Sequence, residues 1–304
     1  MEEIPGIPGP SGRTALRLAC RTAGPGDGEP VLLIQGLGMQ LVDWPQPFIE
    51  ALAQRYRVIT FDNRDCGLST SFGPAFEPDA MARGRRLFAG QGEPASDTPP
   101  APYTLFDMAD DAVHLMDRLG LKACHLIGFS MGGMIAQIVA ATHPERALSL
   151  TSLMSSDGSA WIDCSAMARE AMLRSMAGFT EREKAVEDGV AAARLYGVKA
   201  ARLSGTVLAR AISGSMARAY NPGGILRQAL AMAATGARQS LLADIDVPTT
   251  VIHGQHDICI APEQGRRAAA RIPGARFVAL PEAGHDVEDV DPALMPQILA
   301  SMVH

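Results

Sequence analysis

Short apolar runs that alternate with segments of helical spacing constrain the fold of this chain most strongly. Six runs are nearly continuous in apolar character, as strands are when helices cover both faces of a parallel sheet. They cover residues 31–35, 57–61, 124–129, 148–154, 249–253 and 276–280. A seventh run, residues 15–23, alternates more between apolar and polar residues and would suit an edge strand.

Between these runs, the apolar residues recur at helical intervals. The helices expected from this spacing cover residues 45–54, 106–119, 131–142, 262–271 and 292–303. Strands that alternate with helices in this way predict an α/β fold with a doubly wound, mostly parallel sheet.

Two stretches interrupt the alternation. Residues 73–102 are rich in Pro, Gly and charge, which predicts a long surface loop with at most one helical turn. Residues 157–246 separate two predicted strands by about ninety residues, far more than an ordinary connection needs. They contain helical segments at 166–177, 181–195 and 225–234. We expect residues 1–156 and 247–304 to form the core and residues 157–246 to form an inserted helical lid.

Composition narrows the classes of partner. The 304 residues carry 27 Lys and Arg against 33 Asp and Glu, a net charge of -6, without basic clusters. This gives no reason to expect binding to nucleic acid or to an anionic membrane. The amino terminus does not resemble a signal peptide, and no apolar stretch approaches the roughly 20 residues that cross a bilayer. Five scattered cysteines form no CxxC pair. We expect a soluble cytoplasmic protein without a metal site or a disulfide framework.

The most informative motif is Gly-Phe-Ser-Met-Gly-Gly at residues 128–133. It follows an apolar strand and begins a helical run, which is the setting of the GxSxG nucleophile elbow. Gly128 and Gly132 leave room for the tight turn, and backbone strain at Ser130 would lift its hydroxyl clear of the sheet. The positive end of the helix macrodipole would favour a developing oxyanion. The motif therefore predicts Ser130 as a nucleophile.

A serine hydroxyl needs a base within hydrogen-bond reach, and the base needs an acid that orients it. Among seven histidines, His285 follows the last predicted strand, at the same sheet edge as the elbow. Asp257 follows the strand at 249–253, and the chain order Ser130, Asp257, His285 suits this architecture. Asp157 is the best alternative acid.

Two backbone N–H groups would bind the oxyanion. Met131, directly after the nucleophile, offers one, and Leu37, in the loop after an early strand, offers the other. Gly36 and Gly38 on either side of Leu37 would let the backbone approach the substrate closely.

Five segments in order resemble the α/β-hydrolase superfamily: VLLIQGLG, FDNRDCGLST, GFSMGG, PTTVIHGQHD and LPEAGH. The chain is similar to lid-bearing carboxylesterases and lactonases, a group that includes aclacinomycin methylesterase and 3-oxoadipate enol-lactonase. Relatives that cleave carbon–halogen bonds or epoxides have an aspartate at the elbow, and Ser130 argues against both reactions. The family often has His-Gly where this chain has Gln35-Gly36, and Arg-Gly where this chain has Arg64-Asp65. We interpret Arg64 and Asp65 as a structural ion pair or turn.

These features predict a serine hydrolase of small or medium apolar or aromatic carboxylic esters that needs no cofactor. Trp161, Tyr196 and Tyr220 are candidate pocket residues in the lid. The same triad could open lactones, hydrolyse carbon–carbon bonds or perform perhydrolysis, and the sequence does not separate these reactions. A non-catalytic ligand-binding protein of the same fold is a further alternative. The partner is a small-molecule ester, and the sequence leaves a homodimer open.

Overall fold

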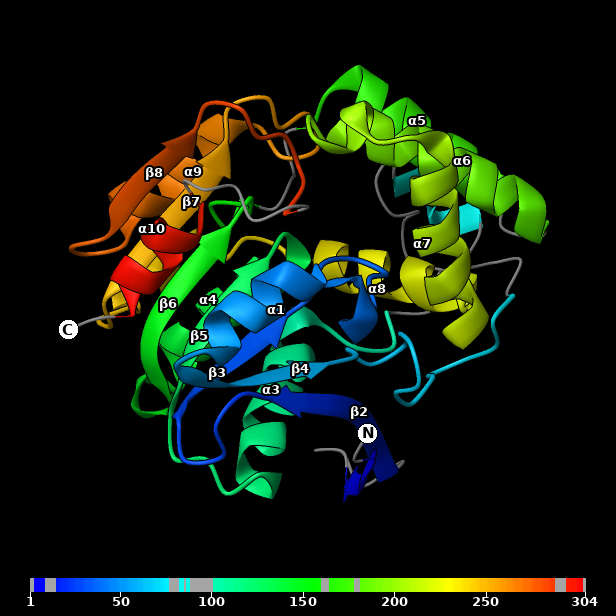
Figure 1. The fold of residues 1–304 in the computed structure, drawn as a ribbon. Coiled ribbons are helices and arrows are strands. Elements are labelled where there is room, and N and C mark those ends of the chain that lie inside the picture. The colour runs from blue at the N-terminus through cyan, green and yellow to red at the C-terminus, as the bar shows by residue number, and fades with distance from the viewer. Residues whose placement is uncertain are drawn as a thin grey trace.

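A computed structural model describes residues 3–8, 15–76, 82–84, 86–87, 101–159, 164–177, 181–287 and 294–302 of the chain. Eight strands form one sheet in the order β1-β2-β4-β3-β5-β6-β7-β8 (Figure 1). Their bounds are β1 Glu3–Pro8, β2 Ala15–Ala23, β3 Glu29–Ile34, β4 Tyr56–Phe61, β5 Cys124–Phe129, β6 Ala147–Leu153, β7 Thr249–Gly254 and β8 Arg276–Leu280.

The six strands from β4 to β8 in this order are parallel, whereas β1 and β2 run antiparallel to their neighbours. The predicted α/β class with a mostly parallel sheet is confirmed. The expectation that residues 15–23 form the edge is wrong, because β1 pairs with the outer side of β2. The sequence of β1, EIPGIP, does not predict a strand, because Pro and Gly disfavour strand formation. A strand at the sheet edge tolerates Pro because one side of its ladder has no partner.

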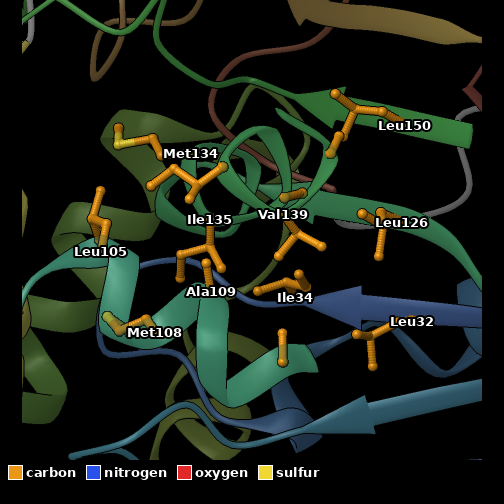
Figure 2. Close-up of a cluster of buried hydrophobic side chains, with 14 of the residues drawn as sticks. Leu32, Ile34, Leu105, Met108, Ala109, Leu126, Met134, Ile135, Val139 and Leu150 are labelled. Carbon is orange, nitrogen blue, oxygen red and sulfur yellow. The ribbon is translucent and has the colours of Figure 1, made fainter. Parts of the chain in front are cut away.

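Helices cover both faces of the sheet. On one face lie α3 (Leu105–Arg118), α4 (Met131–Thr142) and α9 (Pro262–Arg271), and on the other lie α1 (Gln46–Ala53) and α10 (Leu294–Ser301) (Figure 1). The side chains of each strand alternate between the two cores. Leu32 and Ile34 of β3 pack with α3 and α4 (Figure 2). Val31 and Leu33 pack with α1 on the other face. Burial on both faces explains the continuous apolar runs.

The regular elements in the described part of the segment between β6 and β7 are helices, joined by loops. It contains α5 (Ala166–Ala177), α6 (Arg182–Tyr196), α7 (Gly205–Arg218) and α8 (Pro222–Thr235), with 3-10 turns at Ala200–Arg202 and Gln239–Asp244. In Figure 1, α5, α6 and α7 stand apart from the sheet, beyond the carboxyl ends of its strands. In contrast, α8 packs beside α3, and the Leu105 N–H donates to Thr235 Oγ1 at 2.8 Å.

Two buried ion pairs join the loop after β4 to helices. Arg64 binds Asp111 of α3 through two hydrogen bonds of 2.6 Å. Asp65 binds Arg227 of α8 at 2.7 and 3.0 Å and accepts a third bond from the Tyr103 hydroxyl. The two residues are therefore structural, as the sequence suggested, but each pairs with a helix and not with the other. Asp65 has φ of 62°, a left-handed conformation that Asp tolerates better than most residues.

Among the described residues, no helix is both long enough and apolar enough to cross a membrane.

We expect Asp65→Asn to lower the free energy of unfolding by about 3 kcal/mol, because it removes the carboxylate that binds the buried Arg227. Asn keeps the size of the side chain and tolerates the left-handed backbone. The matched control is Glu282→Gln, which removes a 3.5 Å pair with Arg202 whose side chains are 69% and 71% exposed. That change should cost less than about 1 kcal/mol. Urea unfolding followed by circular dichroism measures both, and equal losses would contradict this account.

Candidate active site

Ser130 stands at a sharp turn between β5 and α4. Its backbone has φ of 54° and ψ of -117°, a strained conformation for a residue with a side chain. A side chain at Gly132 would collide with the carbonyl oxygen of Ile34 in β3, and one at Gly128 would collide with the Gly132 carbonyl. Only glycine fits at both positions, so the two glycines of the motif allow the turn to lie against the sheet.

The structure brings Ser130, His285 and Asp257 together. His285 Nε2 lies 3.0 Å from Ser130 Oγ, and His285 Nδ1 lies 2.7 Å from Asp257 Oδ2. Asp257 and His285 occupy the loops that follow β7 and β8, at the carboxyl edge where β5 ends. The His285 ring packs on Phe129, with ring centroids 5.0 Å apart. The imidazole is therefore held between a hydroxyl and a carboxylate by contacts on three sides.

The Asp257 carboxylate is buried and accepts several hydrogen bonds. The N–H groups of Cys259 and Ile260 donate to Oδ1 at 2.8 and 2.9 Å, and His253 Nε2 lies 3.1 Å from Oδ2. Burial raises the pKa of Asp257, but the charges and hydrogen bonds of His285 and His253 outweigh burial and hold this pKa well below its usual value. Asp257 is therefore a carboxylate at neutral pH and can stabilise a positive charge on His285.

The loop after β3 approaches Ser130 closely. A side chain at Gly36 would lie 3.3 Å from the Ser130 Cβ atom, so only a small residue leaves this space open. Leu37 follows Gly36 and lines the same cavity as Ser130. In the described chain, the N–H groups of Leu37 and Met131 donate no hydrogen bond, and Met131 is the first residue of α4. Both groups are thus available to a negative oxygen.

The helical segment between β6 and β7 holds the histidine loop in place. The His285 N–H donates to the Tyr196 carbonyl oxygen at 2.8 Å, and the Lys199 N–H donates to Asp286 Oδ2 at 3.2 Å. Gly284 fits against the Tyr196 carbonyl because it has no side chain. Sequence reasoning considered Tyr196 only as a pocket residue and missed this backbone contact. A carbonyl leaves no signal in a sequence, so no motif could have revealed it.

A cavity of about 480 Å³ contains the reactive atoms of Ser130 and His285. Its wall is mainly apolar and includes Leu37, Met134, Met172, Leu226, Met232 and Ile260. Of the predicted pocket residues, Gly36 and Tyr196 line this cavity. Gly38 and Tyr220 line a neighbouring cavity of about 180 Å³ instead. Trp161 lies outside the described residues.

The alternative acid, Asp157, is bound elsewhere. Its Oδ2 atom lies 2.7 Å from Arg267 and 3.2 Å from Arg271, both in α9. Burial raises the pKa of Asp157. The hydrogen bonds from Arg267 and Ser159 lower this pKa by more than burial raises it, so it falls below its usual value. The His285 ring pairs with Asp257 and not with Asp157.

One group of side chains in the described chain is close enough to hold a metal ion, and it overlaps with these residues. Asp257, Cys259 and His285 have donor atoms within 4.8 Å of one another. Burial, followed by the charge of Asp257, raises the pKa of the Cys259 thiol far above its usual value. A thiol that stays protonated is a poor metal ligand, and His285 is already engaged by two partners.

Known proteins resemble this chain in sequence and in structure. It is 27% identical over 279 residues to rhodomycin D methylesterase of Streptomyces sp. strain C5, with 84% of each chain covered. It is 36% identical over 118 residues to a putative carbamate hydrolase of Caulobacter segnis, a match that spans 39% of this chain and about a third (34%) of that relative. The enol-lactonase of Burkholderia xenovorans LB400 has the same fold, with a TM-score of 0.72, 23% identity and coverage of 95% and 97%.

A family match covers most of the chain. Residues 29–292 match the family described as the alpha/beta hydrolase fold, a span that runs from β3 through the loops carrying Asp257 and His285. The resemblance inferred from the motifs is confirmed, and the chain belongs to the α/β-hydrolase-fold family of hydrolases.

Proposed function

We propose that this protein is a serine-dependent hydrolase of carboxylic esters that works through an acyl-enzyme intermediate. The observation that supports this most strongly is the continuous line of hydrogen bonds from Asp257 through His285 to Ser130, with distances of 2.7 and 3.0 Å. Both distances lie within the range that proton transfer requires.

In the first half of the reaction, Ser130 Oγ attacks the ester carbonyl carbon while His285 Nε2 takes the hydroxyl proton. The carbonyl oxygen becomes an anion, which the N–H groups of Leu37 and Met131 bind; each is worth about 3 kcal/mol in the transition state. The charge on Asp257 stabilises the protonated imidazole. His285 then gives its proton to the alcohol oxygen as the ester C–O bond breaks, and the acyl group stays on Ser130.

In the second half, water replaces the alcohol. His285 takes a proton from water as its oxygen attacks the acyl carbon, and the proton then passes to Ser130 Oγ as that bond breaks. The acid is released and the protein returns to its starting state. The amino terminus of α4, at Met131, favours both anionic intermediates through its partial positive charge.

The cavity supports an ester with a mainly apolar body. Its volume of about 480 Å³ lies within the range for small-molecule sites. We propose that α5, α6 and α7 act as a cap over the site, which agrees with the contact between Tyr196 and His285. A lactone is an internal ester and would follow the same steps, so ring-opening is a second activity within this proposal.

Replacing the nucleophile should abolish turnover. We expect Ser130→Ala to lower kcat for p-nitrophenyl acetate, butyrate and octanoate by at least about 10⁴-fold, because no hydroxyl remains to form the acyl-enzyme. The matched control is Ser213→Ala, an exposed serine of α7, which should keep full activity. A fluorophosphonate probe should label the wild-type protein at Ser130 only. Retained turnover in Ser130→Ala, or labelling elsewhere, would exclude this nucleophile.

The two candidate acids can be compared directly. We expect Asp257→Asn to lower kcat by about 10⁴-fold, since an amide cannot hold the imidazole in the required tautomer or stabilise its cation. Asp157→Asn should lower stability, because it leaves Arg267 and Arg271 without their partner, while kcat changes only a few-fold. Steady-state kinetics on p-nitrophenyl butyrate measures both. If Asp157→Asn caused the larger loss of kcat, the acid would be misassigned.

A further inference from the structure

Arg238 is a buried arginine on the wall of the active-site cavity. It lies between α8 and the 3-10 turn Gln239–Asp244, and it is 4% exposed. It lines the same cavity as Ser130 and His285. Its backbone N–H donates to the Gly158 carbonyl at 2.6 Å, which fixes the position of the residue. Arg238 takes no part in the proposed ester hydrolysis by Ser130, His285 and Asp257.

The Arg238 guanidinium has few partners. Nη2 donates to Ser156 Oγ at 3.2 Å, and Nη1 lies 3.5 Å from Gln137 Oε1. These two neutral partners leave most of its five N–H groups unused. Among the described residues, no carboxylate lies within ion-pair distance of Arg238. The side chain thus carries a buried positive charge that pairs with no described carboxylate.

The acid whose charge acts on Arg238 is bound by other arginines. Asp157 acts on Arg238 through its charge, but its carboxylate is bound by Arg267 and Arg271. Asp157 therefore already has two arginine partners and forms no ion pair with Arg238. Burial lowers the pKa of Arg238 to about 10, so the group still carries its proton at neutral pH. Because a buried charge is costly without a partner, this arrangement is suited to an anion that arrives with the ligand.

The other charged residues of the cavity are less suited to bind an anion. Asp43 and Asp286 are acidic and accept hydrogen bonds from the backbone N–H groups of Gln40 and Lys199. Arg169 also lines the cavity but is only half-buried, so water screens its charge more strongly. Arg238 is the cationic side chain of this wall that is almost fully removed from solvent.

We propose that Arg238 is a carboxylate-binding subsite and that the protein prefers esters bearing a free carboxylate. The planar guanidinium fork matches a carboxylate, and the apolar remainder of the cavity accommodates an organic body between that carboxylate and the ester. The proposal rests on the proposed ester hydrolysis at Ser130. It narrows the expected substrate from any apolar ester to an apolar ester with one anionic end.

Pairs of substrates in which a carboxylate is compared with its uncharged methyl ester test this preference. On the acyl side, p-nitrophenyl hydrogen glutarate and adipate are compared with their methyl esters. On the alcohol side, 4-acetoxybenzoate is compared with methyl 4-acetoxybenzoate. We expect kcat/KM of the wild-type protein to be about 10- to 100-fold higher for the carboxylate member of at least one pair, and the preferred pair identifies the side on which Arg238 lies.

Variants assign the preference to a residue. Arg238→Gln should bring the ratio within each pair close to one, mainly through KM, while kcat/KM for the uncharged esters changes less than about 3-fold. Arg238→Lys should keep part of the preference because it keeps the charge but loses the fork. Arg169→Gln, the matched control, should leave the ratio unchanged. A preference that survives in Arg238→Gln, or disappears only in Arg169→Gln, would refute the subsite.

The wild-type ratio alone can also overturn the proposal: equal rates for both members of every pair would do so even if Arg238→Gln failed to fold. A binding measurement separates this proposal from the proposed hydrolysis. Calorimetry on Ser130→Ala should detect 4-phenylbutyrate and not 4-phenylbutanamide. If the carboxylate binds while wild-type protein neither hydrolyses esters nor reacts with the fluorophosphonate, the subsite stands and the hydrolase mechanism is wrong. If neither ligand binds and esters are hydrolysed without charge preference, the hydrolase mechanism stands and the subsite is wrong.

Discussion

The close contact between the turn at Ser130 and strand β3 is the constraint on which the site depends. Gly132 lies directly against the Ile34 carbonyl, so the amino terminus of α4 is pressed onto the sheet. This contact forces the left-handed backbone at Ser130 and brings Gly36 next to the same residue. The strain is maintained because β5 and α4 are buried on all sides and leave the turn no room to relax. Ser130, the proposed nucleophile, and both candidate oxyanion donors are thus positioned by backbone packing.

The remaining parts of the site come from elements far apart in the chain. Parallel strands end at a common edge, which brings the loops after β7 and β8 to the turn after β5. The helical segment between β6 and β7 then restrains the His285 loop through the Tyr196 carbonyl. It also contributes Arg238 to the cavity wall. The core therefore supplies Ser130, Asp257 and His285, whereas the insertion supplies much of the cavity wall and restrains the His285 loop.

Much of the fold could be predicted from the sequence, because burial on both faces of the sheet produces apolar runs that are hard to mistake. Helix α4 and strand β5 were predicted with the bounds that they have. Strand β1 was missed because its Pro and Gly residues oppose strand formation except at an edge. The partners of Arg64 and Asp65 were also out of reach: Asp111 and Arg227 lie 47 and 162 residues away, and ion pairs over such separations leave no local pattern.

The sequence by itself determined the α/β class, the turn at Ser130 and the order of Ser130, Asp257 and His285, because these depend on local spacing and on the repeated alternation of strand and helix. Only the tertiary structure decided which residues share a cavity. It separated Gly38 and Tyr220 from the cavity of Ser130 and paired Asp157 with two arginines. It also buried Arg238 where no described carboxylate pairs with it. Distances between side chains depend on how distant elements pack, and charge balance depends on those distances.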